Sequence, residues 1–152
     1  MPKKKYEELT DLEKIHKQWN KLSGLHSRQE WSAAIVRAAT AAEIAANLAI
    51  RTEFESQSAL EPIFVDSMLR WANGLSGKMD RLLIPLTAHK KARNAAMKSL
   101  QKLANTVNLK RNAVAHQGEF CNEDEAKAAI ETTREFITRL VQIYEPTFSL
   151  KK

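Results

Sequence analysis

The sequence predicts an all-α protein, a bundle of four to five helices in a single domain. Apolar residues recur at intervals of three and four along most of the chain, and the alternation typical of strands is absent. The 152 residues include only four glycines and four prolines, which leaves few turns between long helices. We expect one domain over 1–152, with a core over about 10–146 and short basic tails.

Two helices are expected in the first third of the chain. The first begins near Thr10, because Thr10 and Glu13 have the spacing of a capping box, and it ends at Gly24. The second is long and covers about 27–53. Its many alanines over 38–49 predict close contact with neighbouring helices, since small side chains let backbones approach.

Two polar residues, Glu43 and Asn47, interrupt that apolar stretch. They are four residues apart and therefore share one face of the helix. A carboxylate in such a place needs a partner. Glu43 and Asn47 are either a buried polar pair whose hydrogen bonds are satisfied within the protein, or residues with a functional role.

A third helix is expected over about 60–73, after a turn at 55–59. Pro62 fits this helix only in its first turn. The segment 74–85 contains two glycines and is expected to be a connection with a short helical turn around 79–83.

The last two helices flank a polar segment. The fourth helix is expected over about 87–107, with lysines on its outer face. The segment 108–121 lacks a long apolar stripe, so we expect it to be non-helical. Asn122 has the character of an N-cap, and the final helix follows it and stops before Pro146.

The net charge of +6 is unevenly distributed along the chain. The segment 78–111 holds nine basic residues and one acid, Asp80. Such a one-sided segment suits the binding of phosphate groups, and a merely solvated helix face is the equally open alternative. The basic residues are Lys78, Arg81, Lys90, Lys91, Arg93, Lys98, Lys102, Lys110 and Arg111.

The composition excludes several classes of protein. The single cysteine, Cys121, excludes an intrachain disulfide and a cysteine-based zinc site. His16, His26 and His89 lie far apart in the sequence and lack the spacing of metal ligands. We therefore expect neither a metal nor a cofactor. No apolar stretch is expected to approach the ~20 residues that span a bilayer, and no signal-peptide core is present. We therefore expect a cytoplasmic protein without a membrane partner.

The segment Arg111-Asn112-Ala113-Val114-Ala115-His116 carries the most informative chemistry. Histidine exchanges protons near neutral pH, and arginine holds phosphate oxygens through paired donors. A continuous helix would place Arg111 and His116 about 140° apart around its axis, and a bend would bring them together. Each residue also has a structural alternative. His116 would form hydrogen bonds at a helix end, and Arg111 would form an ion pair.

This segment, followed by Gly118 and a capped final helix, resembles the R-x(4–6)-H signature of the HEPN superfamily. The resemblance extends over about 31–144, but only the motif is specific. It implies a helical bundle that forms a symmetric dimer, in which both motifs meet at one composite cleft and cut RNA without a metal.

The resemblance also implies roles for individual residues. His116 would be the general acid or base in attack by the ribose 2′-hydroxyl, and Arg111 would stabilise the phosphate. Asn112 would position the motif and Glu43 would orient Arg111 or His116. Because this mechanism needs the 2′-hydroxyl, DNA would be bound but not cut. Lys110, Lys102, Arg93 and Asn47 would contact the RNA.

Members of the family differ in activity. Some are toxins or antiviral effectors with an antitoxin or nucleotidyltransferase partner, and these toxins often carry a tyrosine two residues after the histidine. Here that position is Gly118. Other members are non-catalytic modules that bind a nucleotide or RNA, and this is the alternative function. A purely structural helical adaptor is a third possibility.

Overall fold

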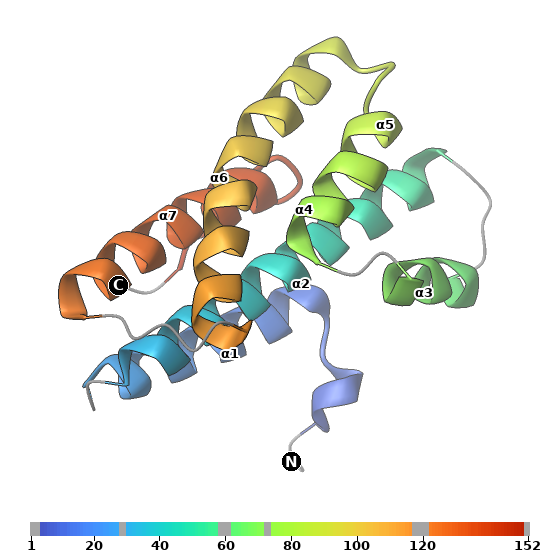
Figure 1. Cartoon of the computed structure of the whole chain (residues 1–152). Helices are drawn as coiled ribbons and strands as arrows, with labels where there is room; N and C mark the ends of the chain where they lie inside the picture. Colours follow the sequence, from blue (N-terminus) through green and yellow to red (C-terminus); the bar gives the residue numbers. More distant parts are fainter. Residues whose placement is uncertain (1–3, 28–29, 58–61, 72–73, 117–121, 151–152) are drawn as a thin grey trace.

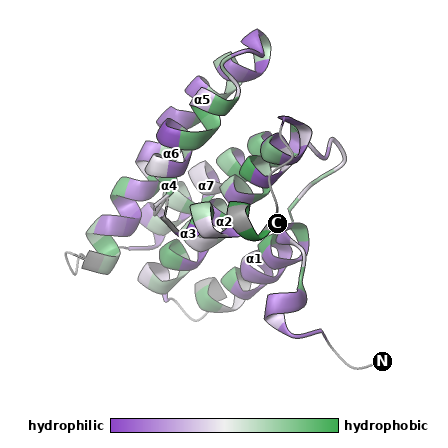
Figure 2. Cartoon of the chain, turned by 90° about the vertical axis from the view of Figure 1, so that its right-hand side faces the viewer, coloured by the Kyte–Doolittle hydropathy of each residue, from purple (hydrophilic) through white to green (hydrophobic). Residues whose placement is uncertain are grey.

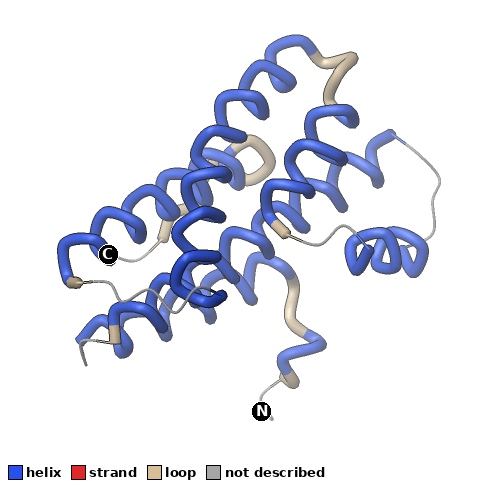
Figure 3. The backbone as a smooth tube through the Cα atoms, in the orientation of Figure 1, coloured by secondary structure: helices blue, strands red, loops and turns tan. Residues whose placement is uncertain are grey.

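A computed structural model shows an all-α bundle, which confirms the predicted fold class. The structure describes residues 4–27, 30–57, 62–71, 74–116 and 122–150, and these ranges contain helices and loops without a strand (Figure 3). Five helices have ten or more residues. They are α1 (Asp11–Ser27), α2 (Trp31–Gln57), α3 (Pro62–Trp71), α6 (Lys91–His116) and α7 (Glu123–Gln142).

The predicted capping box starts α1. The Thr10 N–H donates to Glu13 Oε1 at 3.0 Å, and the Glu13 N–H donates to Thr10 Oγ1 at 3.2 Å. A short 3₁₀ helix, η1 (Tyr6–Glu8), precedes it. The predicted end at Gly24 is wrong, because α1 continues to Ser27. A single glycine inside a helix costs only about 1 kcal/mol, which the packing of Trp19 and Leu22 offsets.

The centre of the bundle is α2, which contacts α1, α6 and α7 (Figure 1). Its alanines are the reason, since Ala38, Ala42, Ala45 and Ala49 are at most 1% exposed. The helix begins and ends about four residues later than predicted, so that residues 55–57 are helical rather than part of a turn.

By length and composition, α2 could also cross a membrane. Its 27 residues include an 18-residue window with a mean hydropathy of 1.4, so the expectation that no apolar stretch approaches this length is wrong. Of that window, 67% is buried inside the bundle, as in the core helix of a globular protein.

The segment 75–86 is helical throughout, whereas the sequence predicted a connection with only a short helical turn around 79–83. It consists of α4 (Leu75–Gly77), a six-residue π-helix η2 (Lys78–Leu83) and α5 (Ile84–Leu86). Leu75, Met79 and Leu83 recur every four residues and are buried, so this apolar stripe outweighs the two glycines. Gly74, with a φ of +84°, makes the turn that starts the segment.

The largest difference from the predicted elements concerns α6. Residues 87–90 form a turn instead of the first turn of the helix, and α6 then continues nine residues beyond Val107 to His116. In Figure 2 the turns of α6 are largely hydrophilic. Burial of Met97, Leu100, Ala104 and Val107 is enough to hold the helix against its neighbours.

Asn122 caps α7 as predicted, because its Oδ1 accepts the Glu125 N–H at 2.9 Å. The core extends beyond 146, which corrects the predicted boundary. Phe148 and Leu150 are buried, and the Phe148 ring lies 5.2 Å from the His16 ring on α1. The chain end after α7 therefore closes one side of the bundle.

Candidate functional site

The Arg111–His116 motif forms the last turns of α6 rather than a loop. The helix is continuous through His116, so the bend that would bring the two residues together is absent. Their positions are about 140° apart around the helix axis. Arg111 and position 116 of one chain therefore belong to different faces of α6.

Arg111 continues the buried stripe of α6. It follows Ala104 and Val107, which are 0% and 5% exposed, by seven and four residues. The Arg111 side chain is half-buried, and its Nη1 donates to Asn112 Oδ1 at 3.4 Å. Of the predicted catalytic residues, the structure thus brings Arg111 and Asn112 together.

Position 116 shares the other face with Leu109 and Asn112, because these residues are separated by seven and four. Leu109 is a large apolar residue beside the motif and is 71% exposed. The side chain of His116 lies outside the described residues, as do Gly118 and Cys121 in the segment 117–121.

Glu43 and Asn47 meet a partner that the sequence did not indicate. Asn47 Oδ1 accepts a hydrogen bond from Lys78 Nζ at 2.6 Å. Burial lowers the pKa of the Lys78 ammonium, and the nearby Glu43 carboxylate partly counteracts that effect. Lys78 is 5% exposed, so this cluster is a satisfied polar group between α2 and η2.

Two of the predicted RNA-binding cations are engaged in ion pairs. Lys110 Nζ lies 2.7 Å from Glu125 Oε2 and links α6 to α7. Arg93 Nη1 lies 3.1 Å from Glu53 Oε2. Arg93 is also about 27 Å from Arg111 along the helix axis, so it is remote from the motif. Lys102 is exposed and closer to the motif.

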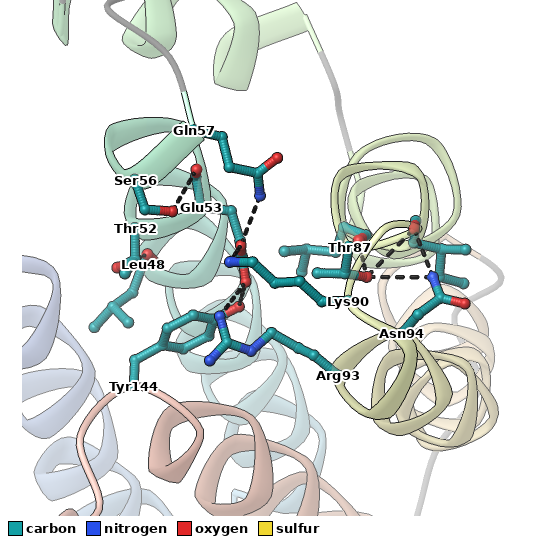
Figure 4. Close-up of polar contacts among 12 residues, drawn as sticks. Leu48, Thr52, Glu53, Ser56, Gln57, Thr87, Lys90, Arg93, Asn94 and Tyr144 are labelled. Carbon is teal, nitrogen blue, oxygen red and sulfur yellow. Dashed lines mark hydrogen bonds and ion pairs between the residues drawn. The ribbon is translucent and has the colours of Figure 1, made fainter.

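The most buried carboxylate, Glu53, was not among the predicted residues. It is 0% exposed and holds four side chains from α2, the N-terminal end of α6 and the chain after α7 (Figure 4). Besides Arg93, these are Lys90 at 3.0 Å, Gln57 at 2.8 Å and Tyr144, whose hydroxyl donates at 2.6 Å. Its position four residues after Ala49, on the buried stripe, was the available sequence signal.

This network determines the charge states of its members. Burial alone would raise the pKa of the Glu53 carboxyl, but hydrogen bonds from Tyr144, Lys90 and Gln57 outweigh it and lower that pKa. Burial and the same carboxylate raise the pKa of the Tyr144 hydroxyl far above its usual range. The arrangement is two neutral donors and two cations fixed around one carboxylate, which suits stability rather than proton transfer.

An apolar cavity of about 270 Å³ lies between α2, α6 and α7. The Lys110–Glu125 ion pair lines one part of it, and Ile35, Val107 and Ala129 line another. The hydroxyls of its threonines donate to carbonyls four residues earlier. The cavity wall is therefore mainly hydrocarbon.

Among the described residues, no three histidine, cysteine, aspartate or glutamate side chains are close enough together to hold a metal ion. The chain matches no protein-family model, and no curated protein or solved structure is significantly similar to it.

Proposed function

We propose that the chain is a metal-independent endoribonuclease of the HEPN type that acts as a symmetric dimer. The observation that carries the proposal is that the motif forms the last turns of a long helix, beside the exposed Leu109. Asn112 is half-exposed there, and the exposed Lys102 follows the same helix toward its middle. A polyanion approaching this end meets a protein with a net charge of +6.

A dimer resolves the separation of the two motif residues. Within one helix, Arg111 and position 116 are about 140° apart, so a single protomer does not present both to one phosphate. A two-fold arrangement of α6 ends allows His116 of one protomer and Arg111 of its partner to reach the same phosphate. Leu109, on the face of position 116, provides an apolar contact for that arrangement.

The proposed reaction is transesterification at phosphorus. The 2′-oxygen of the ribose attacks the phosphate while one imidazole takes its proton, and the second imidazole of the dimer protonates the leaving 5′-oxygen. Arg111 stabilises the additional negative charge on the phosphate. Asn112 fixes the arginine through its side-chain oxygen, and Lys102 contacts the RNA backbone.

The variant His116→Ala tests this proposal. We expect it to lose at least about a hundredfold of the RNA cleavage rate, because general acid–base catalysis contributes that factor or more. Labelled single-stranded RNA and its DNA copy, each with and without EDTA, are resolved on a gel. Wild type should cut only the RNA, with or without EDTA.

The matched control is His89→Ala, since His89 is an exposed histidine at the other end of α6. That variant should cut RNA like the wild type. Cleavage by His116→Ala at the wild-type rate would remove the histidine from the mechanism, and cleavage abolished by EDTA would contradict a metal-independent reaction.

The alternative is a non-catalytic module that binds RNA or a nucleotide. The half-buried place of Arg111 on the stripe of Val107 favours it, because that position also suits a structural arginine. It predicts saturable binding without strand scission, weakened by salt as phosphate contacts are screened.

A biological role as a toxin or antiviral effector in the cytoplasm follows from the nuclease proposal. An antitoxin or a nucleotidyltransferase partner would restrain cleavage in that role. Growth arrest on expression of the wild type, relieved by His116→Ala, is the expected result. Arrest that persists in the variant would separate toxicity from the proposed cleavage.

A further inference from the structure

A second pocket, which the proposed mechanism does not use, lies where α4 and η2 meet the middle of α6. Its volume is about 520 Å³, and its lining is polar. Six residues line it: Ser76, Gly77, Asp80, Arg81, Gln101 and Asn105. In Figure 1, α4 lies beside α6 at this level, and the two elements are in contact.

Gly77 lines this pocket, and neither its backbone nor its packing explains a glycine there. Its φ of −65° and ψ of −40° are helical, so the backbone conformation does not require glycine. A Cβ atom added to it would meet nothing within 4 Å, so packing does not require glycine either. Glycine is nonetheless less favourable than alanine in a helix. The six-residue π-helix begins at the next residue, and such distortions are frequent at functional sites.

The polar groups of the pocket leave hydrogen-bonding capacity unused. Asn105 Oδ1 accepts from Ser76 Oγ at 3.0 Å and from Gln101 Nε2 at 2.8 Å, which turns its amide into a fixed platform. Gln101 Oε1 is buried and has no hydrogen-bond partner within the described residues. A buried acceptor without a donor is costly, and a water or a further molecule in the pocket would satisfy it.

Asp80 and Arg81 add two charged groups to the rim. Both are exposed, and neither side chain is paired within the part of the chain that the structure describes. Asp80 supplies two acceptor oxygens, and Arg81 supplies paired donors. The pocket therefore offers acceptors and donors side by side, which suits a planar ligand that has both.

The pocket shares a face of α6 with the motif. Gln101, Asn105 and Asn112 are separated by four and seven residues, and position 116 follows four residues later. Asn105 and Asn112 are about 10 Å apart along the helix axis.

From these features, we propose that the pocket binds a guanine base of single-stranded RNA. The inference depends on the proposed nuclease function for its substrate class. Guanine presents two neighbouring donors, N1–H and the N2 amino group, to a carboxylate such as Asp80. Its O6 and N7 acceptors suit the paired donors of an arginine such as Arg81. Unpaired bases of RNA are commonly recognised through such edges.

Binding is measured by fluorescence anisotropy with labelled single strands whose riboses carry 2′-O-methyl groups, which prevents cleavage. The probes are an all-uridine strand and the same strand with one central guanosine or one central adenosine. Wild type should bind the guanosine strand about tenfold more tightly than the other two, the factor typical of one well-made pair of base contacts.

Two variants test the site itself. Gly77→Leu fills the pocket without strain at this helical backbone, and Asp80→Asn removes one acceptor oxygen without changing the size of the side chain. Both should bind all three strands equally. The control Ala92→Leu adds the same bulk at an exposed position nine residues before Gln101, on the opposite side of α6, and it should keep the guanosine preference.

The pocket proposal is overturned if the wild type shows no guanosine preference, or if Gly77→Leu and Asp80→Asn retain it. It is also overturned if guanosine monophosphate alone binds as tightly as the guanosine strand, since the pocket would then belong to a free nucleotide. Loss of preference in both variants supports the pocket even if the wild type never cuts RNA. In that case only the nuclease proposal fails.

Discussion

Glu53 shows how single side chains connect distant parts of this chain. The carboxylate lies on α2, yet its partners include Lys90 in the turn before α6, Arg93 at the start of α6 and Tyr144 after α7. The Arg93 guanidinium also lies 5.3 Å from the centre of the Tyr144 ring. A buried carboxylate is tolerated here because every oxygen accepts hydrogen bonds.

The variant Glu53→Gln should destabilise the fold by about 2 kcal/mol, because Lys90 and Arg93 lose their counter-charge. The cost is moderated since both cations are about one third exposed, 32% and 33%, and regain water. Urea unfolding gives the free energy. Glu55→Gln, an exposed change on the same helix, is the control and should stay within about 0.5 kcal/mol of wild type. Equal stability of all three proteins would refute the role assigned to Glu53.

The same residue predicts an acid-sensitive contribution to stability. The pKa of Glu53 is lower in the folded chain than its ordinary value of 4.5, so in acid the unfolded chain binds the proton more readily. The contribution is therefore present above that value and is lost as the pH falls through the lower folded pKa. The stability difference between wild type and Glu53→Gln should shrink from about pH 5 to pH 3. A difference that is constant across this range would contradict the lowered pKa.

Among the helices, α6 differs most from what its local sequence predicted. Its apolar stripe weakens after Val107, and the following residues are mainly polar, so the sequence favoured a helix end. A solvated helix needs no apolar stripe, however, and Leu109, Lys110, Arg111 and the alanines of the motif all have high helix propensity. The predicted elements elsewhere had either caps or buried stripes, which are local signals.

Substitution of Leu109 tests whether the motif is helical. Leu109→Ala preserves helix propensity, whereas Leu109→Gly lowers it, so the glycine variant should be less stable by about 1 kcal/mol. Both variants lose the leucine side chain, so the difference between their stabilities reflects helix propensity alone. Thermal or urea unfolding followed by circular dichroism measures the difference. Two variants of equal stability would indicate that residue 109 is outside a helix.

The whole molecule is a bundle in which α1, α6 and α7 pack around the central helix α2. Large apolar side chains on the outside of this bundle are candidates for contacts with a second copy of the chain. Leu109 and Ile63, at 71% and 80%, are much more exposed than Tyr6, at 37%. Only Leu109 lies beside the motif. This distinction gives the proposed dimer a specific contact that can be tested apart from catalysis.

If the α6 ends meet in a dimer, Leu109→Lys should shift the protein toward monomers, because it places like charges at the two-fold contact. Ile63→Lys makes the same chemical change on α3 and should leave the association unchanged. Sedimentation equilibrium over a range of protein concentrations provides the mass. A monomeric wild type, or equal effects of the two variants, would exclude this contact.

The sequence by itself determined the all-α class, the capping of α1 and α7, the alanine-rich central helix and the residues of the motif. These features depend on the intervals between residues along one helix. Side chains three or four residues apart lie on the same face, so the intervals can be read from the sequence. The tertiary structure alone decided which polar groups meet: Glu53 with Arg93 and Tyr144, Asn47 with Lys78, and the pocket at Gly77. Such contacts join residues far apart in the chain, and they depend on how helices pack, which local periodicity does not specify.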